Sequence, residues 1–209
     1  MILGKSAIRQ ALATGDIRLL DDRGFDLPEW EDIRNPDDPH RLGLPDPIAL
    51  QPASIDLHLG NEWLVPTANV RHTAWEMPPK YTDSKHPIFY ESKIAESYMI
   101  PAHGFVLVRT REVIGISDRL FAKIEGRSSV GRLGLIVETA GVVDSGFQGS
   151  VTLELVNVLP NPLLVHAGMR GCQITFARVE GSTEGGYHAG KYMGQVQTTG
   201  SLLHKDFGA

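Results

Sequence analysis

The sequence predicts one mainly β domain over residues 1–209, with the architecture of a distorted jelly roll or β-barrel. Three observations indicate this class. Short runs of alternating apolar and polar residues recur along the chain, turn residues separate these runs at short intervals, and a helical period is almost confined to the N-terminus. With 209 residues and 42% apolar content, the chain is also long enough to bury a core of its own.

The first fifteen residues predict a short amphipathic helix. Ser6 suits the N-cap position, and Gly15 is a typical stop. Ile8, Ala11 and Leu12 fall on one face of the helix. We therefore expect this helix to pack on the core and to have no chemical role.

Two long stretches interrupt the regular pattern. Residues 21–51 are rich in Asp, Pro, Arg and His, and their prolines predict a long loop. Residues 66–96 are irregular and aromatic. The second stretch is compatible with a flap, a subunit contact or an insertion that covers the core, and the sequence leaves these alternatives open.

Strand patterns occupy most of the remaining chain. Ile55, Leu57 and Leu59 share one face of a predicted strand and leave His58 on the other face, where exposure to water is the default. Further strand-like runs lie at 100–110, 113–124, 163–165 and 170–176. Frequent turns between such short runs are what a barrel or jelly roll requires.

The segment Gly126–Arg132 has the composition of a phosphate cradle at the start of a short helix. Serine at a helix start can cap free backbone N–H groups, those groups favour an anion, and arginine can bind phosphate oxygens through two donors. The predicted ligand is therefore polyanionic. A capped surface turn with two solvated arginines is the alternative, because short Ser/Gly/Arg clusters are common.

The next segment, 140–149, predicts a β-hairpin that turns at Asp144-Ser145-Gly146 and leads into an alternating strand at 150–156. Period two places Thr152 and Glu154 on the face opposite the apolar residues of that strand. If this face is wet, Glu154 is simply solvated. If it faces a closed pocket, Glu154 is a candidate general base whose pKa is tuned by burial.

Composition excludes several classes of protein. The net charge of −5 argues against a broad nucleic-acid surface, so phosphate binding must be local. The single cysteine, Cys172, excludes an internal disulfide and a cysteine-rich zinc site, and its apolar neighbours predict a buried position. Without a signal peptide or long apolar run, the chain is expected to be cytoplasmic and not to enter a membrane.

Four motifs together resemble the dCTP deaminase branch of the dUTPase-like superfamily. The family pattern Gly-Arg-Ser-Ser-x-x-Arg-x-Gly-Leu stands at Gly126 to Leu135. A Thr-Ala loop, an Asp-x-Gly-Phe/Trp-x-Gly turn and a strand ending in Leu-Glu follow in order at Thr139-Ala140, Asp144–Gly149 and Leu153-Glu154. The combination is far more specific than any single piece.

The resemblance implies a distorted jelly roll of the dUTPase-like type, with a short helix after the Arg-Ser-Ser motif. It implies a homotrimer with sites between subunits, and it makes residues 21–51 and 66–96 insertions. It also makes residues 181–209 a flexible lid that folds over bound nucleotide, because Lys191 to Gln195 match the Lys-Tyr-x-x-Gln of the family. Asp56 corresponds to an aspartate near the phosphates and their metal.

The implied reaction is the hydrolytic deamination of dCTP to dUTP and ammonia, a step toward dTTP precursors. Glu154 would act as base and then acid, and Arg132 would hold the attacking water or the charge that develops on it. The implied substrate-binding residues are Arg127, Ser128, Ser129, Val130, Gly131, Arg132, Asp144, Thr152, Leu153, Glu154, Gln173, Tyr187, Lys191 and Gln195.

Zinc is not expected, because the chain lacks the His-x-Glu and Pro-Cys-x-x-Cys motifs of zinc deaminases. Mg²⁺ is expected with the triphosphate. The segment Ala-Gly-Val-Val-Asp and Gln173 resemble the corresponding residues of bifunctional enzymes, which continue to dUMP and pyrophosphate. In that case Asp144 would activate the attacking water. A plain dUTP diphosphatase and a non-catalytic nucleotide-binding regulator are the alternatives.

One segment departs from the family pattern. Relatives commonly have His-x-Thr-Ala after the Leu-x-Val strand, whereas residues 137–140 are one residue shorter and carry Glu138. That loop lies near the base in relatives and responds to dTTP in some of them. The resemblance is therefore least informative about pyrimidine selectivity and about dTTP as a feedback inhibitor.

Overall fold

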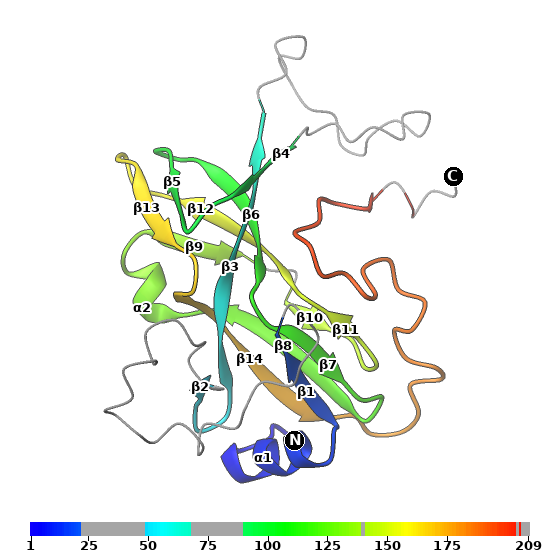
Figure 1. The fold of residues 1–209 in the computed structure, drawn as a ribbon. Coiled ribbons are helices and arrows are strands. Elements are labelled where there is room, and N and C mark those ends of the chain that lie inside the picture. Colours follow the sequence, from blue (N-terminus) through cyan, green and yellow to red (C-terminus); the bar gives the residue numbers. More distant parts are fainter. Residues whose placement is uncertain (22–48, 68–89, 139–140, 204, 206–209) are drawn as a thin grey trace.

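The mainly β class is confirmed by a computed structural model, which describes residues 1–21, 49–67, 90–138, 141–203 and 205 (Figure 1). The large sheet curls around the core, and α1 (Lys5–Ala13) covers one end of it. Most of the two predicted insertions and the Thr139-Ala140 loop lie outside the described residues. The division into one domain with two insertions stays a prediction.

The large sheet is antiparallel throughout. Its strand order is β10 (Val142–Val143), β8 (Leu120–Gly126), β14 (Arg170–Arg178), β3 (Ile55–Pro66), β6 (Phe105–Thr110), β12 (Thr152–Asn157) and β9 (Leu135–Glu138). Two further strands, β2 (Ala49–Leu50) and β4 (Tyr90–Ile94), pair with opposite ends of β3. The strand at 90–94 is a correction to the irregular structure predicted for residues 66–96.

The length of β3 explains how the sheet curls. Its first half pairs with β14 and its second half with β6, and the register with β6 shifts between Leu59 and Trp63. Such an irregularity bends a strand and increases its local twist. The strand β3 therefore joins the part of the curled sheet that contains β14 to the part that contains β6.

Two smaller sheets complete the wall. One has the order β1 (Ile17–Leu20), β7 (Val113–Ile116) and β11 (Gln148–Gly149), and the other joins β5 (Ser97–Ile100) to β13 (Leu163–His166). The Arg-Ser-Ser motif forms the predicted short helix, α2 (Ser128–Gly131), between β8 and β9. Among the described helices, none has the length and apolar character to span a bilayer.

Alternation along the strands builds the core as predicted. Leu57 and Leu59 of β3 and Leu153 and Leu155 of β12 are fully buried. Trp63 is buried with its indole N–H donated to the carbonyl oxygen of Ala95 at 2.9 Å, which removes the cost of an unpaired polar group. Cys172 is buried in the same core, as expected.

Three local predictions are wrong. Residues 140–149 do not form a hairpin, because β10 pairs with β8 and β11 pairs with β7; only the turn survives, with the Phe147 N–H donated to Asp144 O. Gly4 and not Ser6 is the N-cap of α1. His58 is 4% exposed and bonded to Glu112 at 2.6 Å, because the end of β6 and its following loop cover that face of β3.

Asn157 fixes the end of β12, the strand that carries Glu154. It is fully buried, its amide nitrogen donates to Ile100 O, Pro101 O and Asn161 O, and its Oδ1 accepts the Leu159 N–H. Asn157→Asp removes the donors and places a carboxylate against carbonyl oxygens. We expect the free energy of unfolding to fall by about 3 kcal/mol or more in urea titrations.

Asn161→Asp is the matched control, because the Asn161 side chain is exposed. Its effect should stay within about 0.5 kcal/mol. Equal unfolding midpoints for the two variants would show that the bonds of Asn157 contribute nothing.

Candidate active site

A pocket of about 410 Å³ lies against the sheet, where β6 and β12 meet the turn after β10. Its walls come from parts of the chain that are far apart in sequence. The lining residues are Tyr90, Phe105, Leu107, Ile124, Gly141, Val142, Val143, Asp144, Phe147, Val151, Thr152, Glu154, Tyr187, Tyr192, Gln195, Thr199, Gly200 and Ser201. Most of them are apolar or aromatic, with few charged groups, as in many small-molecule sites.

Glu154 lies at the centre of the strand that forms the pocket floor. The register of β12 places it between Leu107 of β6 and Glu138 of β9. Its Oε2 atom is buried and has no hydrogen-bond partner among the described residues. A buried carboxylate oxygen without a partner is costly in a folded protein, and such groups cluster at functional sites.

The surroundings of Glu154 shift its protonation. Burial raises the pKa of Glu154, and the negative charge of Glu138 across the strand pair raises it further. The pKa of Tyr90 is also raised, first by burial and then by the charge of Glu154. Glu154 therefore lines the pocket with a buried carboxylate oxygen, and its role as a general base stays a prediction.

Asp144 supplies the second carboxylate of the pocket lining. The turn that follows it is closed by the Phe147 N–H donated to Asp144 O at 3.1 Å. Phe147 packs on Tyr187 of the tail with ring centroids 5.9 Å apart. Residues on the turn and the tail therefore line the same cavity.

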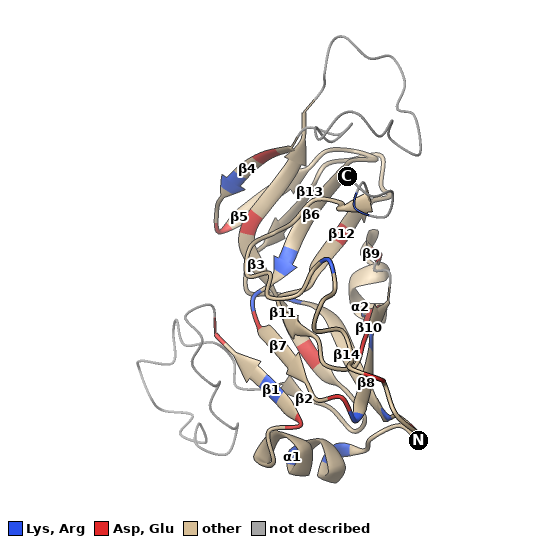
Figure 2. Cartoon of the chain, turned by 90° about the vertical axis from the view of Figure 1, so that its right-hand side faces the viewer, with Lys and Arg blue, Asp and Glu red and all other residues tan. Residues whose placement is uncertain are grey.

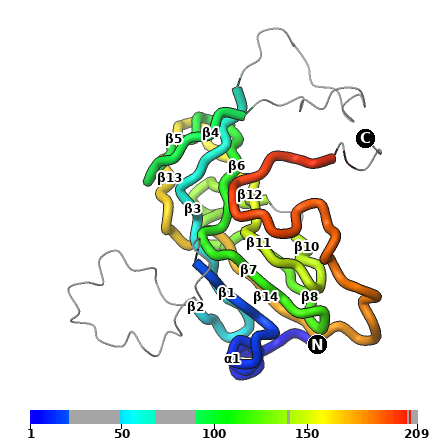
Figure 3. The backbone as a smooth tube through the Cα atoms, turned by 45° about the vertical axis from the view of Figure 1, so that its right-hand side comes forward, coloured from blue at the N-terminus to red at the C-terminus, as the bar shows by residue number. Residues whose placement is uncertain are grey.

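The C-terminal tail forms one side of the pocket. Figure 3 shows it running from the end of β14 past β10 and β11 towards β12 and β6. Tyr187 donates its backbone N–H to Ser145 O at 2.7 Å, and Gln195 donates its amide to Ser150 O at 2.7 Å. Of the predicted tail residues, Tyr187 and Gln195 line the pocket and Lys191 does not.

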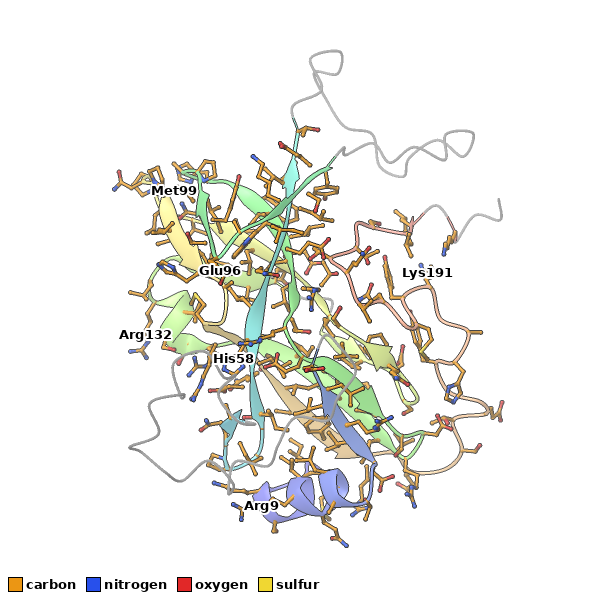
Figure 4. All side chains as sticks on the ribbon, viewed as in Figure 1. Arg9, His58, Glu96, Met99, Arg132 and Lys191 are labelled. Atoms are coloured by element: carbon orange, nitrogen blue, oxygen red, sulfur yellow. The ribbon has the colours of Figure 1, made fainter. Side chains whose placement is uncertain are left out.

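The predicted phosphate cradle lies elsewhere in the chain. Figure 4 shows Arg132 beside α2 and Lys191 on the tail at opposite sides of the molecule. Ser128, Ser129 and Arg132 are exposed, and no residue of 126–132 lines the pocket. The predicted serine cap is wrong: the N-cap of α2 is Arg127, without a side-chain cap bond.

Asp56 holds Arg127 in place. Asp56 is 3% exposed, and its Oδ2 lies 3.2 Å from Arg127 and 3.8 Å from Arg170, while Arg127 also donates to Arg170 O at 3.1 Å. Arg127 is therefore an oriented guanidinium and not a solvated one. Gln173 lies beside Asp56 in the β14–β3 register, near this cluster and outside the pocket lining.

The remaining predicted residues are divided between the core, α2 and the pocket lining. Leu153 is fully buried in the core, Val130 is 5% exposed, and Gly131 lies in α2. Thr152 lines the pocket beside Glu154. Within the described residues, no group of three or more His, Cys, Asp or Glu side chains could hold a metal ion.

Sequence reasoning missed several pocket residues. Tyr90 and Tyr192 are aromatic lining residues, and Leu107 lies beside Glu154 on β6. The aromatic content of residues 66–96 was a signal for Tyr90.

Figure 2 shows Lys and Arg distributed over several elements and interspersed with Asp and Glu, which agrees with local rather than extended anion binding.

Comparisons with known proteins agree with these motifs. A family model described as dCTP deaminase-like matches residues 41–179. A "dCTP deaminase, dUMP-forming" from Persephonella marina is 41% identical over 161 residues, which cover 77% of this chain and 87% of that protein. A "dCTP deaminase" from Natronomonas pharaonis is 34% identical over 214 residues, which cover 99% of this chain and 96% of that protein.

A solved structure supports the same fold. The 2'-deoxycytidine 5'-triphosphate deaminase from Agrobacterium tumefaciens is 21% identical with a TM-score of 0.52, over 86% of this chain and 48% of that chain. The present chain thus spans about half of that protein, and this likeness concerns the fold alone. On the family model and the relatives at 34–41% identity, this chain belongs to the dCTP deaminase-like family.

Proposed function

We propose that this protein deaminates dCTP by hydrolysis, with Glu154 as the proton-transferring residue and without zinc. The observation that carries the proposal is the buried, unpartnered Oε2 of Glu154 in a largely apolar pocket. The relatives named dCTP deaminase support the substrate. Cys172 supports a zinc-free route, because this single cysteine is fully buried in the core and lies outside the pocket lining.

The proposed reaction is one addition followed by one elimination. The oxygen of a water molecule bonds to C4 of the cytosine while Glu154 takes one of the water protons. Glu154 then passes that proton to the ring nitrogen. The amine leaves as ammonia after a second proton transfer, so that dCTP and water give dUTP and ammonia with Glu154 unchanged. Few lining groups can hydrogen-bond to the Glu154 carboxylate, so the carboxylate is free to accept a proton and donate it again within one turnover.

We propose that the triphosphate is held by Arg127, Ser128, Ser129 and Arg132 of another copy of the chain. Within one chain these residues lie outside the pocket lining, and three of them are exposed. The link between Arg127 and Asp56 supports a cradle that is organised before it meets a ligand. A homotrimer with sites between subunits supplies the missing half of each site.

We also propose that dUTP is carried on to dUMP and pyrophosphate. The Persephonella marina relative is named dUMP-forming, and Asp144 is a second carboxylate in the same pocket. Mg²⁺ usually binds one or two carboxylates together with substrate phosphates, so Asp144 suits an ion brought in by the triphosphate. Such an ion would neutralise phosphate charge during hydrolysis.

A plain dUTP diphosphatase is the next candidate. It would need Asp144 and the phosphate cradle but no carboxylate at position 154. The raised pKa of Glu154 and its unpartnered oxygen favour the deaminase, because a desolvated carboxyl group without a partner is costly and such groups cluster at functional sites.

The pH dependence of deamination tests this chemistry. A base must be ionised, so kcat/KM for dCTP should fall as the pH drops through the raised pKa of Glu154, at a higher pH than an ordinary glutamate would give. Glu138→Gln removes the charge that faces Glu154 from β9, so the acidic limb should move to lower pH. Because Glu138 is exposed, the movement should shrink at high salt.

Other described groups around Glu154 must be considered in that experiment. The titratable ones on neighbouring elements are Tyr90 on β4, Asp144 after β10, and Tyr187 and Tyr192 on the tail. Glu125→Gln on β8 is the matched control, since it makes the same charge change at an exposed site away from the pocket lining. An acidic limb that Glu138→Gln and Glu125→Gln leave equally unmoved would contradict the assignment.

A further inference from the structure

The last part of the tail is fastened to the body of its own chain by buried hydrogen bonds. Thr198 is 6% exposed, and its hydroxyl donates to Glu62 O at 2.7 Å and accepts the backbone N–H of Arg109 at 3.1 Å. The Thr198 N–H donates to Glu62 Oε2 at 2.9 Å, and the guanidinium of Arg109 lies 3.8 Å from the same oxygen. We call Glu62, Arg109 and Thr198 the tail clasp.

A second attachment lies a few residues earlier. The Ser150 N–H donates to Gln195 O at 2.8 Å, and the Gln195 amide donates to Ser150 O at 2.7 Å. A Cβ atom at Gly149 would lie 2.9 Å from Gln195 O and 3.1 Å from the Phe147 ring, so only glycine admits the tail backbone there. The body of the chain thus forms a binding surface that fits residues 195–198 of the tail.

The attached segment continues directly into the pocket wall. The Thr199 N–H donates to Thr152 Oγ1 at 3.1 Å, and residues 199–201 line the pocket that contains Glu154. A Cβ atom built at Gly200 would lie 3.5 Å from the ring of Tyr90, so this part of the tail lies close to that ring. A shift at the clasp would therefore move atoms beside Glu154.

We propose that Thr198 is a positioning residue, which holds residues 195–201 as a standing wall of its own chain's pocket before any nucleotide binds. The catalytic part of this inference rests on the proposed function, because the wall encloses the nucleotide there and limits the water near the reacting carbon. A tail that orders only when ligand arrives is the alternative. The clasp opposes it, because opening breaks the bonds that Thr198 makes with the Arg109 N–H and with the Glu62 carbonyl oxygen.

Amide hydrogen exchange of the full chain without nucleotide separates these two cases. Thr198→Val keeps the shape of the side chain and removes the hydroxyl. We expect exchange over residues 195–201 and at the Ser150 N–H to quicken about tenfold or more, while β14 is unchanged. Thr198→Ser, which keeps the hydroxyl, should restore protection to within about threefold.

Thr183→Val is the matched control, since its hydroxyl lies outside the clasp and outside the pocket lining. Its exchange over 195–201 should equal that of the wild type. Unprotected exchange of residues 195–201 in the wild type without nucleotide would contradict the proposal that this segment is ordered before nucleotide binds. Equal protection in Thr198→Val and the wild type would overturn the role of the clasp.

Kinetics then test the positioning role. Thr198→Val should lower kcat/KM for dCTP about tenfold, mainly through KM, and Thr198→Ser should recover it, while Thr183→Val leaves it unchanged. Wild-type kcat/KM in Thr198→Val would remove the positioning role. If the exchange result holds but the wild type does not consume dCTP, the proposed function fails and the structural role of the clasp stands.

Discussion

Replacing Glu154 with Gln is expected to lower dCTP deamination by about 10²–10⁴-fold or more, the range that general acid–base residues contribute. Glutamine keeps the size of the side chain but can neither accept the proton from water nor return it. Because the change is close to isosteric and removes a desolvated charge, binding of dCTP should stay within about threefold of the wild type. Ammonia release and calorimetric titration with dCTP measure the two effects separately.

Glu138→Gln is the matched control for this loss. Glu138 is the cross-strand neighbour of Glu154 and undergoes the same chemical change, yet it lies outside the pocket lining. It should retain turnover, with only the altered pH dependence described above. Wild-type ammonia release by Glu154→Gln would remove Glu154 from the mechanism.

Asp144→Asn is expected to uncouple the two proposed reactions. Deamination should continue, because Glu154 and its strand are untouched, but dUTP should accumulate, with dUMP formation about 10²–10⁴-fold slower. The reason is that Asp144 is the other carboxylate lining the pocket and follows the strand pair of β10 with β8. Separation of dCTP, dUTP and dUMP over time measures both steps in one experiment.

Asp16→Asn provides the comparison for that variant. Asp16 pairs with Arg119 and lies outside the pocket lining, so its loss should leave both steps unchanged. If Asp144→Asn still forms dUMP at the wild-type rate, Asp144 is not the residue that activates the water. Loss of both steps together would instead assign Asp144 to nucleotide binding.

The sequence predicted the parts of the fold that depend on local pattern. Alternation in residues 55–59 and 151–155 identified β3 and β12 and which of their faces is apolar, because period two follows from strand geometry. The same pattern placed Thr152 and Glu154 together. Whether that face was wet or enclosed depended on β6, the β10 turn and the tail, which no local pattern specifies.

The errors have physical causes of the same kind. Residues 140–149 contain a real turn, but the two strands beside it find partners in different sheets, and pairing partners are a property of topology. His58 has the alternation of a half-exposed strand, yet Glu112 reaches it from 54 residues away. Buried polar pairs of this sort override a pattern that is based on polarity alone.

The motifs of the site could be recognised in the sequence, but which of them lie together in the folded chain could not. Asp144, Thr152, Glu154, Tyr187 and Gln195 come together in one pocket of the single chain. The Arg127–Arg132 cradle lies outside that pocket. The proposed homotrimer would bring the cradle of one copy to the pocket of another, and such a distance is set by the assembly and not by the fold of one chain.

The most direct measurement is an analysis of all products formed from dCTP and Mg²⁺ by the wild-type protein. The proposed account predicts one ammonia for each dCTP consumed, with dUMP and pyrophosphate as the final products and dUTP as a transient. Unchanged dCTP, together with hydrolysis of added dUTP, would contradict it and identify a dUTP diphosphatase in which the pocket carboxylate of β12 has no part in deamination.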